Sequence, residues 1–338
     1  MSKSVRNKTI RFTDLDSDLL YDNVLKWFSS LEESIDKIVH WNSIEELKKI
    51  PSWTIDLIAT DPPYNLSKNY AGNKFSATDN DNYEIRLNEW MKECKRVLKD
   101  AWTIYVCCDW KSSIPVFNVL NKHFILKNRI TWEREKWRWA STNWKNNIED
   151  VYFAVKDDKA YTFNLDAVKV KKKVIAPYKN SEGEAKDWFT ENGENYRMTC
   201  PSNIWTDITI PFWSMPENTE HPTQKPEKVM AKMILASSNE GDIVLDPFVW
   251  SWTTSVVAKK LWRKFIGIEQ EKEYCVVSQH RLNMADLEKS IQWIENWIFL
   301  ERNTMSSERT KLSKKSNTLI NTKKAWITMP QWIFSSPL

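Results

Sequence analysis

Short apolar runs alternate along this chain with longer segments in which apolar residues recur at helical spacing. The runs, rich in β-branched residues, lie at 54–60, 103–108, 125–132, 150–155, 243–246 and 264–269. The helical segments lie at 82–99, 112–122, 226–238, 253–261 and 271–290. Strands that alternate with helices form βα units on a largely parallel sheet. The sequence therefore predicts an α/β fold.

Three regions depart from this alternation. Residues 1–37 are polar and mixed, and we expect an irregular arm with a helix near 18–29. Residues 157–220 are rich in Lys and Asn and resemble an inserted segment, with a basic run at Lys169, Lys171, Lys172 and Lys173. The tail from 301 is rich in Ser, Thr, Lys and Asn, a composition typical of a flexible basic extension.

Composition narrows the class of protein. No stretch approaches the ~18 consecutive apolar residues of a membrane span, and Met1–Asp14 lacks the apolar core of a secretory signal. The five Cys lack CxxC spacing, which favours reduced thiols over disulfides or a zinc site. We expect a cytoplasmic protein without a metal. The net charge of +4 permits an anionic partner but does not require one.

The first apolar run ends at Asp61-Pro62-Pro63-Tyr64, where α/β sheets place ligand sites. An exocyclic amine on a nucleobase is a poor nucleophile because its lone pair is delocalised into the ring. The Asp61 carboxylate and a prolyl carbonyl would accept its hydrogens and localise that lone pair, and the prolines fix the backbone that holds both acceptors. Tyr64 offers a face on which a base extruded from a duplex can stack. A proline-rich turn with a capping Asp is the alternative.

A second predicted turn joins a strand to a helix. Its residues are Asp246, Pro247, Phe248, Trp250, Trp252 and Thr253. A strand that ends in Asp, a tight turn and a helix outline a nucleoside-binding loop. Such a loop normally carries Gly where both Trp stand, because the backbone must turn sharply and approach the ligand. Glu269 ends the next predicted strand, where an acid can accept both ribose hydroxyls; an acid near a helix start is its alternative role.

The segment His221-Pro-Thr223-Gln-Lys225-Pro226 precedes a predicted helix. Pro226 suits the first helical turn, and the Lys225 ammonium would join backbone N–H groups in holding a carboxylate. Taken alone, this segment is better explained as an ordinary helix entry.

Together, the three motifs resemble those of the DNA amino-methyltransferases of bacterial restriction–modification systems. Their order is that of the permuted beta class, in which Asp-Pro-Pro-Tyr comes first and a target-recognition region, Thr-Gln-Lys-Pro and the Asp-Pro-Phe-x-Gly-x-Gly loop follow. The resemblance covers residues 38–290. It implies a Rossmann-like S-adenosylmethionine-dependent methyltransferase fold with circularly permuted motif order and an inserted target-recognition region.

The resemblance also implies the activity and the site. The Asp-Pro-Pro-Tyr tetrad implies base flipping and direct methyl transfer to N6 of adenine in double-stranded DNA, with Asp61, Pro62, Pro63 and Tyr64 as catalytic residues. S-adenosylmethionine is expected on the cofactor loop, with Glu269 on its ribose and Thr223 and Lys225 near its methionine end. The implied cofactor-binding residues are Asp246, Pro247, Phe248, Trp250, Trp252, Thr253, Glu269, Thr223, Lys225 and Asn42.

The same resemblance divides the chain into an arm (1–37), a catalytic half (38–156), a target-recognition region (157–220), a cofactor-binding half (221–300) and a tail (301–338). Double-stranded DNA is the implied partner, and a homodimer and a cognate restriction endonuclease are further candidates; no membrane is involved. The lysines at 169, 171, 172 and 173 are candidate phosphate contacts, with a solvated basic loop as the alternative.

Two features depart from the family pattern. His40-Trp41-Asn42-Ser43 resembles a family His-Gly-Asp-Cys segment whose acid contacts the cofactor's adenine, and Asn42 weakens that contact. The second departure is the ratio of 20 Trp to 5 Gly. The family pattern expects Gly, each time at a turn or an element boundary, at Trp41, Trp53, Trp102, Trp137, Trp139, Trp250, Trp252, Trp262 and Trp297.

This selectivity for turns suggests a translation artefact, in which UGA encodes glycine in the source and was read as tryptophan. UGG codons at 250 and 252 would end that hypothesis. If these Trp are real, their indoles fill the cofactor loop, and the chain is a catalytically dead DNA-binding protein.

Two other enzyme classes share this pattern and stay open, whereas a third does not fit it. A cytosine-N4 methyltransferase shares every binding element. A methyltransferase of RNA or protein glutamine is disfavoured, because such enzymes usually carry Asn at the first tetrad position. An ordinary dinucleotide dehydrogenase needs its glycine loop in the first βα unit and leaves Asp61–Tyr64 unexplained.

Overall fold

The computed structural model describes residues 6–65, 68–70, 73–75, 78–134, 141–175, 178–184, 186–221, 223–250, 253–292, 294–295 and 298–301. Two compact units divide the chain: residues 1–169 with 200–298 form the first, and 170–199 with 299–338 form the second. Within the described residues, no helix has the length and apolar character needed to cross a membrane.

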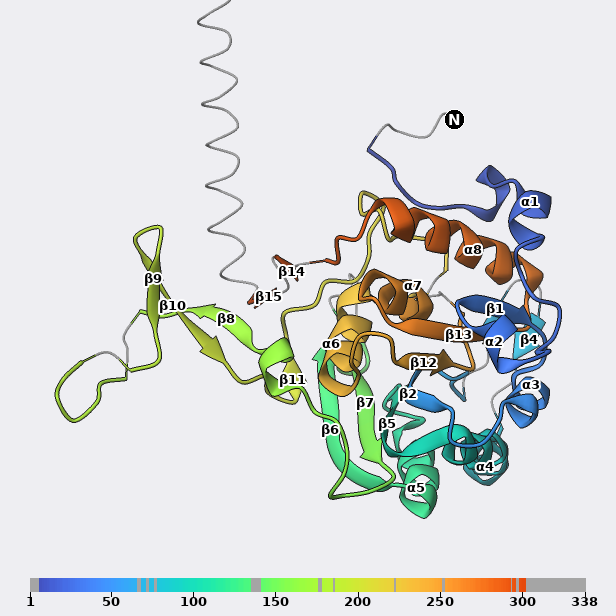
Figure 1. Cartoon of the computed structure of the whole chain (residues 1–338), viewed down its shortest axis with the longest axis horizontal. Helices are drawn as coiled ribbons and strands as arrows, with labels where there is room; N and C mark the ends of the chain where they lie inside the picture. The colour runs from blue at the N-terminus through green and yellow to red at the C-terminus, as the bar shows by residue number, and fades with distance from the viewer. Residues whose placement is uncertain are drawn as a thin grey trace, which may run out of the picture. The chain divides into compact units, whose positions relative to one another are not determined.

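An eight-stranded sheet forms the centre of the first unit (Figure 1). Its order is β1 (Lys37–His40), β13 (Lys264–Glu269), β12 (Ile243–Asp246), β2 (Ile55–Thr60), β5 (Leu98–Cys108), β7 (Ile148–Val155), β6 (Ile125–Glu133) and β11 (Ile204–Trp205). The first five strands are parallel. β7 is antiparallel to both β5 and β6. The predicted α/β fold is confirmed, and the reversed β7 is a feature that the sequence did not reveal.

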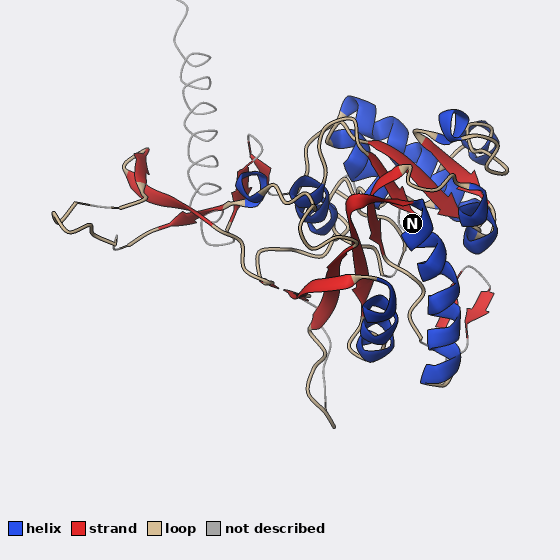
Figure 2. Cartoon of the chain, turned by 60° about the horizontal axis from the view of Figure 1, so that its bottom comes forward, coloured by secondary structure: helices blue, strands red, loops and turns tan. Residues whose placement is uncertain are grey.

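Helices cover both faces of this sheet (Figure 2). One face carries α3 (Ser43–Lys49), α4 (Asn80–Val97) and α5 (Ser113–His123), and the other carries α6 (Glu227–Ser237), α7 (Thr253–Lys260) and α8 (Lys272–Leu287). Successive residues of β5 show the two faces, because strand side chains alternate in direction. Ile104 and Val106 join the core with α4 and α5, whereas the Tyr105 hydroxyl lies 2.9 Å from Ser237 Oγ of α6.

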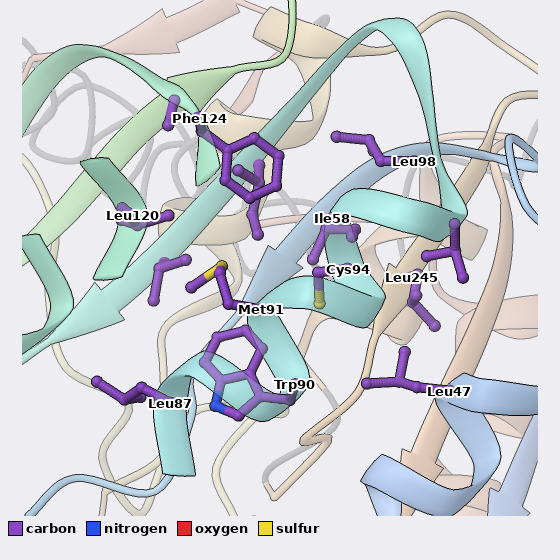
Figure 3. Close-up of a cluster of buried hydrophobic side chains, with 14 of the residues drawn as sticks. Leu47, Ile58, Leu87, Trp90, Met91, Cys94, Leu98, Leu120, Phe124 and Leu245 are labelled. Carbon is purple, nitrogen blue, oxygen red and sulfur yellow. The ribbon is translucent and has the colours of Figure 1, made fainter. Parts of the chain in front are cut away.

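The core between α4 and the sheet follows from the sequence of that helix (Figure 3). Leu87, Met91 and Cys94 recur at three- and four-residue spacing, so they share one helical face. All three are buried against Ile58 of β2 and Leu245 of β12. Burying one such aliphatic side chain contributes about 1.5–3 kcal/mol. The packing fixes β2 and β12, the two strands whose ends carry the predicted motifs.

The N-terminal arm contains a shorter helix than expected. η1 (Phe12–Asp14) and α1 (Ser17–Tyr21) come before α2 (Leu31–Ser34), in place of one helix over 18–29. The apolar residues Leu20, Val24 and Phe28 are buried at four-residue spacing, which reads as helical. The backbone of Leu25 instead pairs with β1, donating to Ile38 O and accepting from His40 N, so the helix cannot continue.

Smaller elements complete the chain. β3 (Lys68–Tyr70) and β4 (Asn73–Phe75) form an antiparallel pair, η2 (Leu165–Val168) follows β7, and β14 (Ile294–Glu295) follows α8. In the second unit, β10 (Glu194–Thr199) pairs antiparallel with β8 (Val170–Lys173) and β9 (Phe189–Glu191). Phe299 and Leu300 of β15 (Ile298–Leu300) pair parallel with β8. Of the expected tail, residues 302–338 lie outside the described residues.

Candidate active site

The carboxyl ends of adjacent parallel strands bring the predicted motifs together. β2 ends immediately before Asp61, and its neighbour β12 ends at Asp246. Thr60 Oγ1 donates to Asp246 Oδ1 at 2.8 Å, across 186 residues of sequence. β13, on the other side of β12, ends at Glu269. One edge of the sheet therefore holds both predicted loops. This edge, at the carboxyl ends of the parallel strands, is where open α/β sheets bind their ligands.

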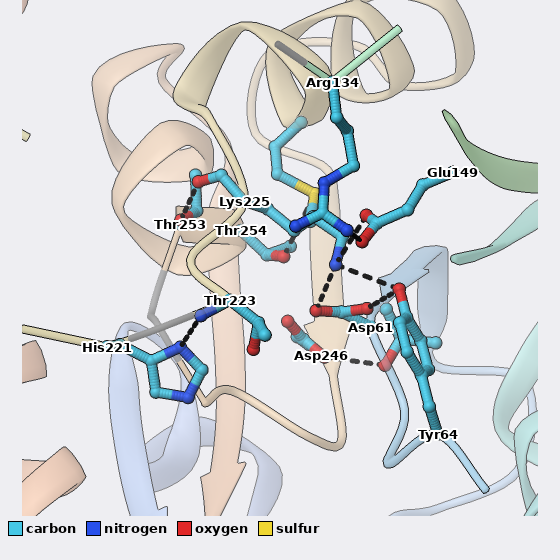
Figure 4. Close-up of polar contacts among 12 residues, drawn as sticks. Asp61, Tyr64, Arg134, Glu149, His221, Thr223, Lys225, Asp246, Thr253 and Thr254 are labelled. Carbon is cyan, nitrogen blue, oxygen red and sulfur yellow. Dashed lines mark hydrogen bonds and ion pairs between the residues drawn. The ribbon is translucent and has the colours of Figure 1, made fainter. Parts of the chain in front are cut away.

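Lys225 is directed at the Asp-Pro-Pro-Tyr turn (Figure 4). Its Nζ donates to Asp61 Oδ2 at 2.7 Å and to the Tyr64 hydroxyl at 3.0 Å. The Tyr64 hydroxyl donates to Asp61 Oδ1 at 2.7 Å. Both oxygens of the Asp61 carboxylate therefore accept a hydrogen bond from a neighbouring side chain. The sequence predicts Lys225 near the methionine end of a cofactor, and the structure places its ammonium on the Asp-Pro-Pro-Tyr turn.

Two residues that the sequence analysis did not single out complete this group. Glu149 Oε2 lies 3.2 Å from Lys225 Nζ, and Glu149 Oε1 accepts from Arg134 Nη1 (Figure 4). Glu149 reaches the site because β7 is antiparallel: Cys108, the last residue of β5, pairs with Asp150 near the start of β7. The sequence contains one signal for Glu149, the acidic pair Glu149-Asp150 at the start of an apolar run. The pair can be assigned to this site only once the direction of β7 is known.

Burial and charge set the protonation of this group. Burial favours a neutral Lys225, but the Asp61 and Glu149 carboxylates outweigh it and raise the pKa of Lys225 above its ordinary value. Burial also raises the pKa of the Tyr64 hydroxyl well above its usual range, and the negative charges of Asp61 and Glu149 add to this. At neutral pH, Lys225 is an ammonium and Tyr64 a neutral phenol, so both are hydrogen-bond donors to Asp61.

The turn itself is held by neighbouring helices. The Tyr83 hydroxyl of α4 donates to Pro63 O at 2.9 Å. Asn65 N donates to Ser112 Oγ at 3.2 Å, and the Asn65 amide both donates to Thr78 O and accepts from Thr78 N. Because the prolines also restrict the backbone, the position of the Asp61 carboxylate is fixed before any ligand binds.

A recess beside the turn is lined by several of the predicted cofactor residues. Its empty volume is about 550 Å³, part of which is open to solvent. The lining residues are Asn42, Ser43, Ile44, Pro63, Phe248, Trp250, Ile268, Glu269, Gln270 and Glu271. Burial raises the pKa of the Glu269 carboxyl to about 8, and Glu269 Oε1 accepts from the backbone N–H groups of Gln270 and Glu271. The recess thus combines apolar sides with one buried acid.

Other predicted cofactor residues fix the loops around this recess. Asp246 Oδ1 also accepts from Phe248 N at 3.1 Å, and burial raises the pKa of Asp246 to about 7. Phe248, which follows Pro247, packs edge-on against Trp90 with ring centroids 5.2 Å apart. Thr253 Oγ1 donates to Lys225 O at 2.8 Å, joining the second turn to the segment before α6.

Two further predicted residues make local backbone contacts. Thr223 N donates to His221 Nδ1 at 3.4 Å. Asn42 is the N-cap of α3, where its Oδ1 accepts from Ile44 N and Glu45 N, the usual role of Asn at that position. The Asn42 side-chain oxygen is therefore committed to the helix. Trp252 lies outside the described residues.

Residues 55–280 match the DNA methylase family model N6_N4_Mtase. This chain belongs to the DNA methylase family. The methylase is 39% identical over 250 residues to the DNA adenine methyltransferase YhdJ of Escherichia coli K12, covering 73% of this chain and 83% of the relative. It is 36% identical over 252 residues to the type II methyltransferase M.HpaI of Haemophilus parainfluenzae, covering 73% and 74%.

Solved structures share the fold of this methylase. The M1.HpyAVI–SAM complex is 25% identical with a TM-score of 0.51, and the match covers 73% of this chain and 98% of that one. The PvuII cytosine-N4-specific DNA methyltransferase is 20% identical with a TM-score of 0.54, covering 72% of this chain and 85% of that one. The expected Rossmann-like methyltransferase fold is confirmed.

The four lysines predicted to contact DNA are each paired with a carboxylate. The pairs are Lys169 with Asp166, Lys171 with Glu191, Lys172 with Glu301 and Lys173 with Glu194, at 2.6–3.1 Å. The Lys171 side chain is only 9% exposed, and its Nζ lies 4.4 Å from the centre of the Tyr196 ring. Lys171 is thus part of the packing of the second unit, whereas Lys172 and Lys173 are more exposed, with 44% and 40% of their side-chain surface accessible.

The described Trp of the expected glycine series differ in their surroundings. Trp53 and Trp262 have φ values of +57° and +59°, a region that favours glycine. Trp41 is 51% exposed. Trp250 lines the recess, 6.1 Å from the His221 ring and 6.4 Å from the Tyr274 ring. Trp102 packs, partly buried, against the core, and Trp137, Trp139, Trp252 and Trp297 lie outside the described residues.

Proposed function

We propose that this methylase transfers a methyl group from S-adenosylmethionine to N6 of adenine in double-stranded DNA. The observation that carries the proposal is the Asp61 carboxylate, fixed at the end of β2 beside Tyr64 and next to the recess of about 550 Å³. The identity of 39% to a protein named DNA adenine methyltransferase supports adenine as the substrate. The alternative, methylation of cytosine N4, would use the same residues.

The residues around the recess suit the adenosine part of S-adenosylmethionine. The buried Glu269 carboxyl is an acceptor for ribose hydroxyls, and Ile44, Phe248 and Ile268 offer apolar contacts for a purine. When bound, S-adenosylmethionine supplies an electrophilic methyl group on its sulfonium. Two lining residues fit less well: the Asn42 oxygen is committed to α3, and the Trp250 indole lines space that a glycine would leave open.

The catalytic turn would activate the amine by accepting its hydrogens. Asp61 is one acceptor, and we assign the Pro62 carbonyl as the other, because the Pro63 carbonyl already accepts from Tyr83. The Tyr64 ring would stack on the base once it has left the duplex. Fixed acceptors and a fixed methyl donor make the transfer a direct, oriented displacement without a covalent enzyme intermediate. No metal is assigned to this step; the described residues contain no group of three or more His, Cys, Asp or Glu placed to hold an ion.

We further propose the beta-class, permuted organisation, with target recognition in residues 157–220. The strands β8, β9 and β10 fall within that range, and the exposed lysines of β8, Lys172 and Lys173, suit contacts with phosphate. A homodimer and a cognate restriction endonuclease stay proposals that rest on the family pattern. We propose that the enzyme acts on DNA at the nucleoid, in the bacterial cytoplasm.

The glycine hypothesis belongs to this proposal, because the cofactor loop depends on it. The positive φ values of Trp53 and Trp262 support glycine at those positions, and the place of Trp250 in the recess supports glycine there. We propose that UGA codons specify glycine in the source gene. The coding DNA tests this directly: UGA is expected at 53, 250 and 262, and UGG at any of these refutes the proposal for that position.

The activity is tested by sequencing modified bases in the DNA of a host that expresses the glycine-restored chain. N6-methyladenine at one recurring sequence is expected. Asp61→Ala should abolish the methylation while calorimetry still detects cofactor binding, because Asp61 does not line the recess. N4-methylcytosine in place of N6-methyladenine would replace the adenine assignment, and DNA without either mark would refute the proposed reaction. Methylation by the chain as printed would refute the role given to the Trp.

A further inference from the structure

We propose that Glu149 is a positioning residue that balances the charge of Lys225, so that Asp61 remains able to accept hydrogen bonds from the substrate amine. The inference rests on the role proposed for Asp61 above. It assigns a function to a buried carboxylate on β7 that is not part of the Asp-Pro-Pro-Tyr turn or of the cofactor loop.

The geometry connects Glu149 to Asp61 through one ammonium group. Lys225 Nζ lies 2.7 Å from Asp61 Oδ2 and 3.2 Å from Glu149 Oε2 (Figure 4). The side chains of Lys225 and Glu149 are each 2% exposed, so water does not screen this contact. The Asp61 and Glu149 carboxylates thus share one buried ammonium group. Each carboxylate weakens the attraction between Lys225 and the other carboxylate.

Charge counting shows what Glu149 contributes. Asp61 and Glu149 carry two negative charges, and Lys225 and Arg134 carry two positive charges, so the group is neutral as a whole. Without the Glu149 carboxylate, the group would carry one net positive charge in a buried site. An unpaired buried charge is costly, and the Lys225 ammonium would then lose one of the two carboxylates that face it, while Asp61 stays.

The reaction makes this charge balance matter. The amine nitrogen forms a bond to the methyl carbon while the carbon–sulfur bond breaks and the sulfur keeps that electron pair. The nitrogen gains positive charge until one of its protons leaves to water. A site that carries a net positive charge disfavours this transition state, whereas a carboxylate close to the nitrogen stabilises it. Glu149 therefore keeps the Lys225 charge from cancelling the effect of Asp61.

The surroundings of Lys225 predict a signature in its titration. The groups that face it are Asp61 and Tyr64 after β2, Cys107 on β5, Glu149 on β7 and Arg134 after β6. Burial lowers the pKa of Lys225 and the two carboxylates raise it. Glu149→Gln removes one of these two carboxylates while burial stays, so the ammonium should lose its proton at lower pH.

The first test is the titration of Lys225 by NMR with ¹³Cε-labelled lysine, which requires no activity. Lys225→Met identifies the resonance. We expect the pKa of Lys225 to be lower in Glu149→Gln than in the unsubstituted chain by about one unit or more, a tenfold change in proton affinity. An unchanged titration refutes the inference.

If Glu149→Gln does not fold, Arg134→Gln replaces it. In Arg134→Gln, the Glu149 carboxylate loses its contact with Arg134 and keeps its contact with Lys225. A pKa of Lys225 that is lower in Arg134→Gln than in the unsubstituted chain would refute the inference.

The second test is the single-turnover methylation rate, measured in the glycine-restored chain. Glu149→Gln should lower the rate about tenfold or more near neutral pH, with cofactor and DNA affinities unchanged. Adding Lys225→Met to Glu149→Gln removes the unbalanced cation and should recover part of the loss. A loss of rate that Lys225→Met does not recover would indicate a merely structural role and refute the inference.

Asp150→Asn is the matched control. Asp150 is the next residue on β7 and is also buried, but it pairs with Arg129 and Thr131 rather than with Lys225. Asp150→Asn should leave the titration of Lys225 unchanged, and an equal shift in both variants would refute the specific role of Glu149. Asp61→Ala separates the two proposals: activity in that variant refutes the role of Asp61, whereas the Lys225 titration still decides the pairing with Glu149.

Discussion

Trp53 and Trp262 adopt the same left-handed backbone conformation, with φ of +57° and +59°. Each lies shortly before a parallel strand, Trp53 before β2 and Trp262 before β13. The indoles are 63% and 48% exposed, so they gain little from packing. A residue with a Cβ atom in this region costs about 1–2 kcal/mol. Both residues therefore hold, at a conformational cost, a backbone geometry that favours glycine.

Trp53→Gly and Trp262→Gly should each stabilise the protein. Removing the left-handed strain outweighs the flexibility that glycine adds to the unfolded chain, and we expect about 1 kcal/mol in the free energy of unfolding per site. Urea unfolding measures it. Trp144→Gly is the control, because Trp144 is 94% exposed and does not have a positive φ; it should not stabilise. Destabilisation by the substitutions at 53 and 262 would contradict the interpretation.

Trp250→Gly combined with Trp252→Gly should strengthen cofactor binding by about tenfold or more. A tenfold change in the dissociation constant corresponds to ~1.4 kcal/mol. The Trp250 indole occupies part of the recess beside Glu269, and its removal opens that space to adenosine. Isothermal titration with S-adenosylmethionine gives the dissociation constant. Trp53→Gly, at the opposite end of β2 from the catalytic turn, is the control and should leave the affinity unchanged. Equal affinity of the unsubstituted chain and the double variant would show that the indole does not obstruct the site.

Folding stability should depend on pH through Asp246. Burial raises the pKa of this carboxyl from 3.8 to about 7, so between these values the folded chain holds a proton that the unfolded chain has released. The contribution of Asp246 to stability therefore falls as pH rises from about 4 to about 7 and is constant above that. Asp246→Asn removes this dependence, and its advantage over the unsubstituted chain should grow toward pH ~8, to an order of 2–4 kcal/mol.

Thermal unfolding across that pH range measures the effect of Asp246. Asp100→Asn, at a side chain that is 80% exposed, is the control and should leave the pH dependence unchanged. If the stability difference between Asp246→Asn and the unsubstituted chain is the same at both ends of the range, the raised pKa of Asp246 is contradicted.

Tyr83→Phe should slow methylation about threefold to tenfold with a stability loss of about 1 kcal/mol, the usual contribution of one hydrogen bond. The Tyr83 hydroxyl fixes the Pro63 carbonyl, and without it the catalytic turn can move. Tyr152→Phe is the matched control: it is equally buried, at 5% exposure, and its hydroxyl contacts Ser113 instead. Equal rates in the two variants would mean that Tyr83 does not position the turn.

Lys172→Ala with Lys173→Ala should reduce the salt dependence of DNA binding. Each lost phosphate contact lowers the slope of log affinity against log salt by about 0.9. Lys171→Ala should instead lower the melting temperature, because Lys171 packs on Tyr196. Binding measured at several salt concentrations decides this. An unchanged slope would identify Lys172 and Lys173 as partners of Glu301 and Glu194 only.

Much of the fold could be predicted because apolar spacing records which side of an element is buried. The strands at β2, β5, β12 and β13 and the helices that follow them appear where the spacing indicates, with ends displaced by a few residues. The direction of β7 could not be predicted, since an apolar run looks the same in either direction. Its pairing with β5 and β6 sets that direction.

The limits of the site prediction follow from the same cause. Asp246 and Glu269 end parallel strands and Asp61 follows the end of one, and an acid at the end of a strand can be recognised locally. Glu149 lies near the start of an antiparallel strand, so its position at the same edge depends on the pairing of β7 with β5. Lys225 was recognised at a helix start, but the Asp61 carboxylate on which its ammonium lies is 164 residues distant.

The hydrogen bond from Thr60 to Asp246 joins the end of the catalytic strand to the end of the cofactor strand. A second hydrogen bond, from Thr253 to the backbone of Lys225, joins the start of α7 to the segment before α6, whose Lys225 ammonium contacts Asp61. The proposed cofactor loop and the Asp-Pro-Pro-Tyr turn are thus held by one connected set of hydrogen bonds. A mutation that loosens the recess should also displace the acceptors that orient the amine. In such an enzyme, cofactor affinity and turnover should therefore change together, unless these hydrogen bonds are first removed.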